Sequence, residues 1–310
     1  MTATTAASLV RAAHATGRAV AAFNVITLEH AEAVTAAAER TGLPVILQIS
    51  ENAVRFHEGR LDGVLAGTAA VAAASDVPVA LHLDHVADEA LLRTGVAAGV
   101  TSVMFDASAL PYEENVRATA QVTAWAHSRG VWVEAELGEV GGKDGAHAPG
   151  VRTDPAEAAA FVEATGVDSL AVAVGSSHAM TERTARLDHA LIARLSAAVG
   201  VPLVLHGSSG VPDTELRQAV AAGMAKINIG TALNIAFTTA VREHLAADAA
   251  VVDPRRYLRQ ARAAMEATAA HLLRVVAEAQ EPTAGTGTEA DAQERGQGAQ
   301  PSGTKEAATG

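Results

Sequence analysis

The chain has 310 residues, 49% of them hydrophobic, and its 23 basic and 35 acidic side chains give a formal net charge of −12. This negative charge argues against a general nucleic-acid-binding surface. The sequence contains no uninterrupted run of about 18 apolar residues, so we expect no membrane span. Cysteine is absent, which excludes disulfides and a cysteine nucleophile, and the first residues do not resemble a secretory signal, so we expect a cytoplasmic protein.

Short apolar runs alternate with Ala-rich segments of helical period along most of the chain. Parallel strands that are covered by helices on both faces have this pattern. The expected strands are residues 19–24, 44–49, 78–84, 102–106, 131–137, 169–174, 202–206 and 226–229. The expected helices include residues 28–41, 88–98, 112–128, 154–165, 188–199 and 212–222.

Eight strands alternating with helices predict an α/β protein of the (β/α)8 TIM-barrel type. An open, doubly wound sheet is the structural alternative. We expect one domain over residues 1–280, which includes a helical extension at its C-terminal end. Residues 281–310 contain no large apolar side chain, so we expect them to form a disordered tail.

Three histidines, His85, His178 and His206, follow apolar runs at the points where buried strands should end. In a TIM barrel the C-terminal strand ends converge on the active site, and a catalytic metal site uses three protein ligands with one position left open. Asp84 would place a carboxylate beside such a metal. Taken singly, each histidine has the alternative of being an ordinary hydrogen-bonded residue. His82 shares a strand face with Asp84, where we expect it to hydrogen-bond within the site without ligating the metal.

Six runs occur in an order and spacing typical of one family: AFNV (22–25), HLDH (82–85), VEAELGEVGG (133–142), GVDSLAVAVGSSH (166–178), VPLVLHGSSGVPD (201–213) and AKINIGT (225–231). In these runs the chain resembles the class II, metal-dependent ketose-bisphosphate aldolases, which include the fructose- and tagatose-1,6-bisphosphate aldolases. The resemblance extends from about residue 19 to about residue 275 and implies the same barrel.

The resemblance implies reversible cleavage of a ketose 1,6-bisphosphate, of fructose or tagatose type, to dihydroxyacetone phosphate and an aldehyde through a zinc-stabilised enediolate. His85, His178 and His206 match the metal ligands of the family. Asp106 and Glu136 match carboxylates that hold the metal, or a second ion, in another position. The expected metal is Zn²⁺, with another divalent ion as the alternative and a monovalent cation as a further expectation. Asp84 matches the residue that exchanges a proton with the C4 hydroxyl.

The resemblance also implies a set of substrate-binding residues. They are Asn24, Ser50, Gly207, Ser208, Ser209, Asn228, Ile229, Gly230, Thr231 and Arg259. In some members of the family the arginine matched by Arg259 binds the distal phosphate across a dimer interface, so we expect a homodimer or homotetramer. Two positions depart from the family. Asp144 stands where a loop glutamate exchanges the C3 proton, and Ala179 follows His178 where glycine is usual.

The chemistry of carbon–carbon cleavage agrees with a metal site. Class I aldolases use a Schiff-base lysine as electron sink, but this chain has only Lys143, Lys226 and Lys305. A metal that polarises the ketose carbonyl supplies the same sink. Two alternatives are a metal-dependent hydrolase on the same barrel and a catalytically silent barrel that binds sugar phosphates. The hydrolase is disfavoured because the usual His-x-His pair is absent from the first strand.

Overall fold

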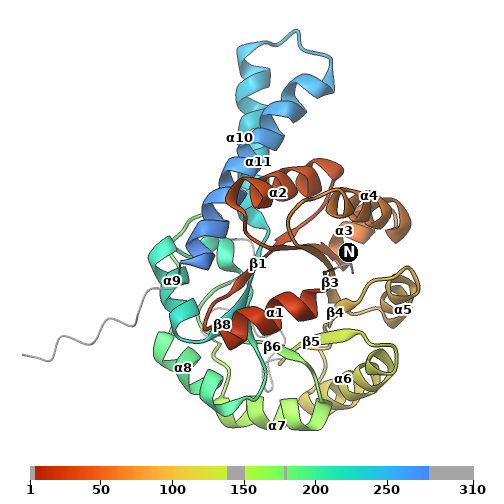
Figure 1. Ribbon diagram of the computed structural model, residues 1–310, viewed down its shortest axis with the longest axis vertical. Helices are drawn as coiled ribbons and strands as arrows, with labels where there is room; N and C mark the ends of the chain where they lie inside the picture. Colours follow the sequence, from red (N-terminus) through yellow and green to blue (C-terminus); the bar gives the residue numbers. More distant parts are fainter. Residues whose placement is uncertain (1–3, 138–150, 178–179, 279–310) are drawn as a thin grey trace, which may run out of the picture.

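Eight parallel strands pair in chain order and close into a barrel (Figure 1). The computed structural model describes residues 4–137, 151–177 and 180–278. The strands are β1 (Val20–Asn24), β2 (Val45–Ser50), β3 (Val79–Val86), β4 (Ser102–Phe105), β5 (Trp132–Glu136), β6 (Ser169–Ala171), β7 (Leu203–Leu205) and β8 (Met224–Ile229). The barrel closes where Ala21 and Phe23 of β1 pair with Ile227 and Ile229 of β8. This topology confirms the predicted (β/α)8 barrel.

The helices surround the barrel, as the alternation predicts. They are α1 (Ala6–Ala15), α2 (Leu28–Thr41), α3 (Glu51–Phe56), α4 (Leu61–Ala73), α5 (Glu89–Ala97), α6 (Tyr112–His127), α7 (Pro155–Thr165), α8 (His189–Ala198), α9 (Asp213–Ala221), α10 (Thr231–Ala247) and α11 (Pro254–Ala277). A short 3-10 turn, η1 (Ser208–Gly210), precedes α9. The expected helices do not include α3 or α4, which both lie between β2 and β3.

Local sequence signals explain where the helices begin and end. The Asp154 carboxylate accepts hydrogen bonds from the backbone N–H groups of Ala156 and Glu157, and Pro155 occupies the first helical turn of α7. Gly42 ends α2 in the left-handed conformation, with φ of 68°. Between the barrel and its helices lies one continuous apolar core, in which side chains such as Phe23, Leu47 and Phe161 are fully buried.

The interior of the barrel is apolar at the end where the strands begin. Ala22, Ile46, Ala80 and Trp132 pack there against Ala6 and Val10 of α1. Helix α1 crosses this end of the barrel (Figure 1). The opposite end, where the strands terminate, therefore remains open for a site.

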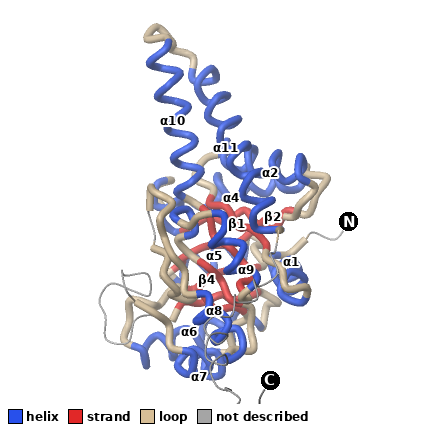
Figure 2. The backbone as a smooth tube through the Cα atoms, turned by 90° about the vertical axis from the view of Figure 1, so that its left-hand side faces the viewer, coloured by secondary structure: helices blue, strands red, loops and turns tan. Residues whose placement is uncertain are grey.

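Helices α10 and α11 form a hairpin that projects beyond the barrel (Figures 1 and 2). The C-terminal part of α11 returns to the barrel and buries apolar side chains that include Met265 and Leu273. Two ion pairs, Arg40–Glu266 and Arg262–Glu32, attach it to α2. This hairpin is the predicted helical extension. The domain boundary at residue 280 stays a prediction, because residues 279–310 lie outside the described ranges. Among the described helices, none has the length and apolar character needed to cross a bilayer.

Candidate active site

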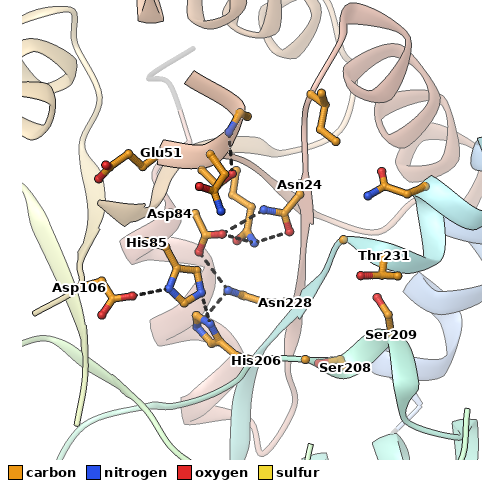
Figure 3. A pocket seen from close by; sticks show the side chains of 18 of the residues that line it. Asn24, Glu51, Asp84, His85, Asp106, His206, Ser208, Ser209, Asn228 and Thr231 are labelled. Atoms are coloured by element: carbon orange, nitrogen blue, oxygen red, sulfur yellow. Dashed lines mark hydrogen bonds and ion pairs between the residues drawn. The ribbon is translucent and has the colours of Figure 1, made fainter. Parts of the chain in front are cut away.

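A cavity of about 730 Å³ opens at the C-terminal ends of the strands (Figure 3). Most of the residues predicted to form the site line this cavity. They are Asn24, Ser50, Asp84, His85, Asp106, Glu136, His206, Gly207, Ser208, Ser209, Asn228, Gly230 and Thr231. The barrel thus brings together side chains as far apart in the sequence as Asn24 and Thr231.

A bulge at the end of β3 directs two consecutive residues into the site. In a regular strand Asp84 and His85 would point to opposite faces of the sheet. The pairing of β3 with β4 shifts its register between Leu83 and Val86, and His85 adopts a positive φ of 48°. A bulge re-aims side chains in this way. Asp84 therefore faces the barrel interior while the imidazole of His85 lies over its rim.

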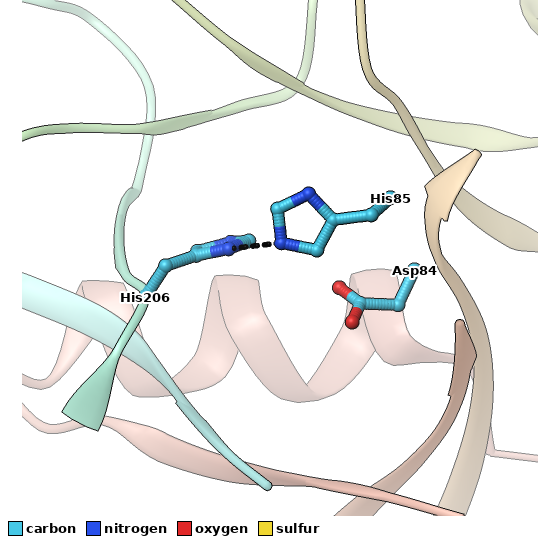
Figure 4. A group of neighbouring side chains, drawn as sticks. All are labelled: Asp84, His85 and His206. Atoms are coloured by element: carbon cyan, nitrogen blue, oxygen red, sulfur yellow. Dashed lines mark hydrogen bonds between the residues drawn. The ribbon is translucent and has the colours of Figure 1, made fainter. Parts of the chain in front are cut away.

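The imidazoles of His85 and His206 meet edge to face, with ring centroids 4.6 Å apart (Figure 4). His85 Nε2 lies 2.8 Å from His206 Nδ1. The other nitrogen of each ring contacts a carboxylate: His85 Nδ1 lies 2.7 Å from Asp106 Oδ2, and His206 Nε2 lies 3.0 Å from Glu134 Oε1. Metal-ligating histidines almost always donate their second nitrogen in this manner.

The electrostatics of the site favour a positive charge between the two imidazoles. Burial disfavours the charge on His85, but nearby carboxylates outweigh burial and raise the pKa of His85 to about 10. These carboxylates belong to Asp84, Asp106 and Glu136. Burial also opposes the charge of Asp106, but the hydrogen bond and charge of His85, together with the hydrogen bonds from Ser108, outweigh burial and lower the pKa of Asp106. The surroundings of His85 therefore favour a positive charge at the place where a metal cation would bind.

Two overlapping groups of side chains have ligand atoms close enough to hold a metal. One group is Asp84, His85 and His206, and the other is His85, Asp106 and Glu136; within each, all ligand atoms lie within 4.8 Å of one another. Nitrogen and carboxylate ligands of this kind suit Zn²⁺. The donor set therefore fits a divalent metal, with two adjacent positions that share His85.

The Asp84 carboxylate is held in place by three amide side chains. Its Oδ2 accepts hydrogen bonds from Asn24 Nδ2 at 3.0 Å and from Gln48 Nε2 at 3.3 Å. Its Oδ1 accepts one from Asn228 Nδ2 at 3.3 Å. Asp84 is only 2% exposed. These bonds orient a buried carboxylate toward the cavity beside His85.

The turn after β7 and the start of α10 border the other side of the cavity. Gly207 has a φ of 66°, and a Cβ atom there would lie 2.5 Å from the carbonyl oxygen of Ser177, so only glycine fits. Ser209 Oγ accepts a hydrogen bond from the Ala232 N–H at 3.0 Å, which joins η1 to the start of α10. The N-terminus of a 17-residue helix and the backbone of η1 therefore form one wall, which suits an anion.

Four predicted site residues remain. His178 and Asp144 lie outside the described residues, and the other two, Ile229 and Arg259, do not line the cavity. Ile229 is buried in the core on the other face of β8. Arg259 is an exposed residue of α11, on the projecting hairpin. A different arginine, Arg55 of α3, lines the cavity and forms an ion pair with Glu51.

Several residues of the site were not predicted from the sequence. Gln48 donates to Asp84, and Glu51 accepts hydrogen bonds from the N–H groups of Ala87 and Asp88 at 2.7 and 3.1 Å, which supports the loop after β3. Lys226 lies beneath the site, where it pairs with Glu134. For Gln48 and Lys226 the available signal was the two-residue period of the strands: each lies two positions before a predicted site residue, Ser50 or Asn228, and so faces the same side of its strand.

Comparisons with known proteins identify the family. Residues 4–281 match the family model described as fructose-bisphosphate aldolase class-II. The chain is 44% identical over 258 residues to a fructose-bisphosphate aldolase of Geobacillus stearothermophilus, which covers 81% of this chain and 88% of the relative. It is 42% identical over 260 residues to the fructose-bisphosphate aldolase of Staphylococcus epidermidis, with 81% and 89% covered.

A solved structure agrees with these sequence comparisons. The YdjI aldolase from Escherichia coli K12 superimposes with a TM-score of 0.77 at 34% identity, covering 88% of this chain and 97% of that protein. The matched region includes all eight strands and the cavity at their ends. The chain therefore belongs to the class II fructose-bisphosphate aldolase family.

Proposed function

We propose that this class II aldolase reversibly cleaves a ketose 1,6-bisphosphate to dihydroxyacetone phosphate and an aldehyde, with Zn²⁺ held by His85, His206 and His178. One observation carries the proposal: His85 and His206 direct nitrogens at each other while a carboxylate holds the opposite nitrogen of each ring. We place the enzyme in cytoplasmic carbohydrate metabolism, within glycolysis, as a homodimer or homotetramer.

Different residues around the cavity would carry out different steps of the reaction. A bound divalent metal would act as a Lewis acid toward the ketose carbonyl. Asp84 would exchange the proton of the C4 hydroxyl, because three amides hold its carboxylate toward the cavity beside His85. Asp144, whose loop lies outside the described residues, would exchange the C3 proton. Asp106 and Glu136 would give the metal a second position around His85.

The two phosphates would bind at opposite sides of the cavity. Residues 207–210 and the N-terminus of α10 offer backbone N–H groups and a positive helix end to the phosphate of dihydroxyacetone phosphate. Arg259 does not line the cavity of its own chain, so we propose that a second copy supplies it to the distal phosphate. Arg55 is the guanidinium that the described chain itself places at this cavity.

Fructose 1,6-bisphosphate is the first substrate to test, because relatives at 40–44% identity are named for it. Tagatose 1,6-bisphosphate differs only at C4 and should be assayed beside it. We expect dihydroxyacetone phosphate to be released from at least one substrate, to stop on addition of a chelator, and to resume with Zn²⁺.

The same assay separates the alternatives. Release of inorganic phosphate without carbon–carbon cleavage would indicate a hydrolase. Tight binding of dihydroxyacetone phosphate without any turnover, in protein that contains stoichiometric metal, would indicate a silent binding barrel. Cleavage that persists in full after the metal is removed would contradict the proposed metal site.

A further inference from the structure

Beneath His206, the barrel interior contains a hydrogen-bonded network of polar side chains instead of the usual branched aliphatic residues. The network consists of Ser102, His82, Lys226, Glu134 and His206, which come from five different strands or strand ends. Each of these residues is at most 2% exposed. Burying ions costs free energy that pairing and hydrogen bonding only partly offset, so this arrangement requires an explanation beyond the stability of the barrel.

The Glu134 carboxylate is the centre of this network. Its Oε2 accepts a hydrogen bond from Lys226 Nζ at 2.7 Å, and its Oε1 lies 3.0 Å from His206 Nε2. Lys226 Nζ also lies 3.4 Å from His82 Nε2, and His82 Nδ1 lies 2.7 Å from Ser102 Oγ. Neither Glu134 nor Lys226 lines the cavity, so neither is in a position to contact substrate.

The direction of these hydrogen bonds determines the tautomer of His206. A carboxylate only accepts hydrogen bonds, so His206 Nε2 must carry the hydrogen and Nδ1 keeps its lone pair. Nδ1 is the nitrogen that faces His85 Nε2 at 2.8 Å. A ring with its hydrogen on Nδ1 would offer no ligand atom in that direction.

Asn228 presents a competing hydrogen bond to the same nitrogen. Its Nδ2 lies 3.1 Å from His206 Nε2 and could donate there only if the hydrogen were on Nδ1. A charged acceptor makes a hydrogen bond roughly twice as strong as a neutral one, which favours the contact with Glu134. Lys226 supplies the opposite charge that a fully buried carboxylate requires.

We propose that Glu134 and Lys226 are positioning residues, which hold His206 as the Nε2–H tautomer and so present its Nδ1 to the metal. This inference rests on the proposed function, since it presupposes that His206 is a ligand. It assigns the buried pair a role in metal affinity beyond the packing of the barrel. Loss of a partner that orients a ligand typically weakens metal binding by about 10- to 100-fold.

The test measures Zn²⁺ affinity of the full-length, metal-free protein by competition with a chromophoric chelator. Lys226→Met keeps the length of the side chain but removes its charge, and Glu134→Gln removes the charged acceptor. Each should weaken Zn²⁺ binding by about 10- to 100-fold. Ser169→Ala is the matched control, because it removes another buried hydrogen bond of the barrel interior, the 3.1 Å contact from Trp132 Nε1, but none of the hydrogen bonds that join Glu134, Lys226 and His206. Its Zn²⁺ affinity should equal that of the parent.

Nitrogen-15 NMR of the histidine rings gives a second readout that a packing defect would not move. In the metal-free parent, Nε2 of His206 should carry the hydrogen, and in Glu134→Gln this preference should be lost. If Lys226→Met is not folded, the double variant Glu134→Gln/Lys226→Met, which removes both charges together, replaces it and should show the same loss of affinity.

The outcomes separate this inference from the proposed function. If His206→Gln binds Zn²⁺ as tightly as the parent, the proposed metal site is wrong. If His206→Gln loses Zn²⁺ while Lys226→Met and Glu134→Gln keep the parental affinity and tautomer, the metal site stands and the positioning role is overturned.

Discussion

The site contains two histidine–carboxylate pairs with the same chemistry in different surroundings. At the rim, the side chains of His85 and Asp106 are 25% and 20% exposed. In the barrel interior, those of His206 and Glu134 are both 0% exposed. Asp106 is supported by the hydroxyl and backbone N–H of Ser108, whereas Glu134 is supported by the ammonium group of Lys226.

This difference predicts how each pair responds to a lost partner. Water can replace a missing hydrogen bond at the rim at little cost. In the interior an unpaired polar group retains its full desolvation penalty. We therefore expect loss of a partner in the buried pair to weaken metal binding more than loss of a partner in the rim pair.

The largest effect should follow from removing the buried ligand itself. His206→Ala leaves the metal without one of its proposed ligands, so the protein should purify without stoichiometric zinc and without aldolase activity. Metal content measured by mass spectrometry, together with circular dichroism as a check of folding, tests this expectation. Full zinc occupancy in the folded variant would show that His206 is not a ligand.

Asp84 lies beside both histidines, but the ligands proposed for the metal are His85, His178 and His206. Asp84→Ala should therefore retain metal while kcat falls by about 10²- to 10⁴-fold, the usual contribution of a general acid–base group. Zinc content and steady-state cleavage should be measured on the same sample. Parental kcat in this variant would exclude the proton-exchange role.

A smaller effect is expected at the rim. Asp106→Asn keeps an acceptor for His85 Nδ1 and leaves the position accessible to water, so Zn²⁺ affinity should fall by about tenfold or less. The Zn²⁺ affinities of Asp106→Asn and Glu134→Gln should be measured under identical buffer conditions. A larger loss at Asp106 than at Glu134 would reverse the order of importance of the two pairs.

The smallest effect is expected from the end of the chain, whose composition offers almost no apolar surface to bury. Residues 282–310 contain no large apolar side chain, so ending the chain at Glu281 should leave the melting temperature, zinc affinity and activity unchanged. Thermal unfolding of the two chain lengths in parallel provides the measurement. A marked drop in melting temperature would show that this segment packs on the barrel.

The barrel could be predicted because it depends on local patterns, whereas most residues of the site were implied by the resemblance to the aldolase family. Apolar runs at regular spacing indicated the strands, and the convergence of strand ends indicated that Asp84, His85 and His206 would meet. The bulge that turns His85 over the rim has no comparable signal, since it arises from the pairing of β3 with β4.

The buried pair illustrates what the sequence could not predict. Glu134 and Lys226 are 92 residues apart, and only barrel closure brings their charges to 2.7 Å. The two-residue period of β8 does predict which of its side chains face the barrel interior. Lys226 and Asn228 share one face of the strand, whereas Ile229 points the other way into the core.

The most direct test of the account is a crystal structure of the zinc-loaded protein with anomalous data collected at the zinc absorption edge. We expect an anomalous peak bonded to His85 Nε2 and His206 Nδ1, with Glu134 still accepting the hydrogen bond from His206 Nε2. A peak bonded through His206 Nε2, or zinc bound away from these two histidines, would contradict it.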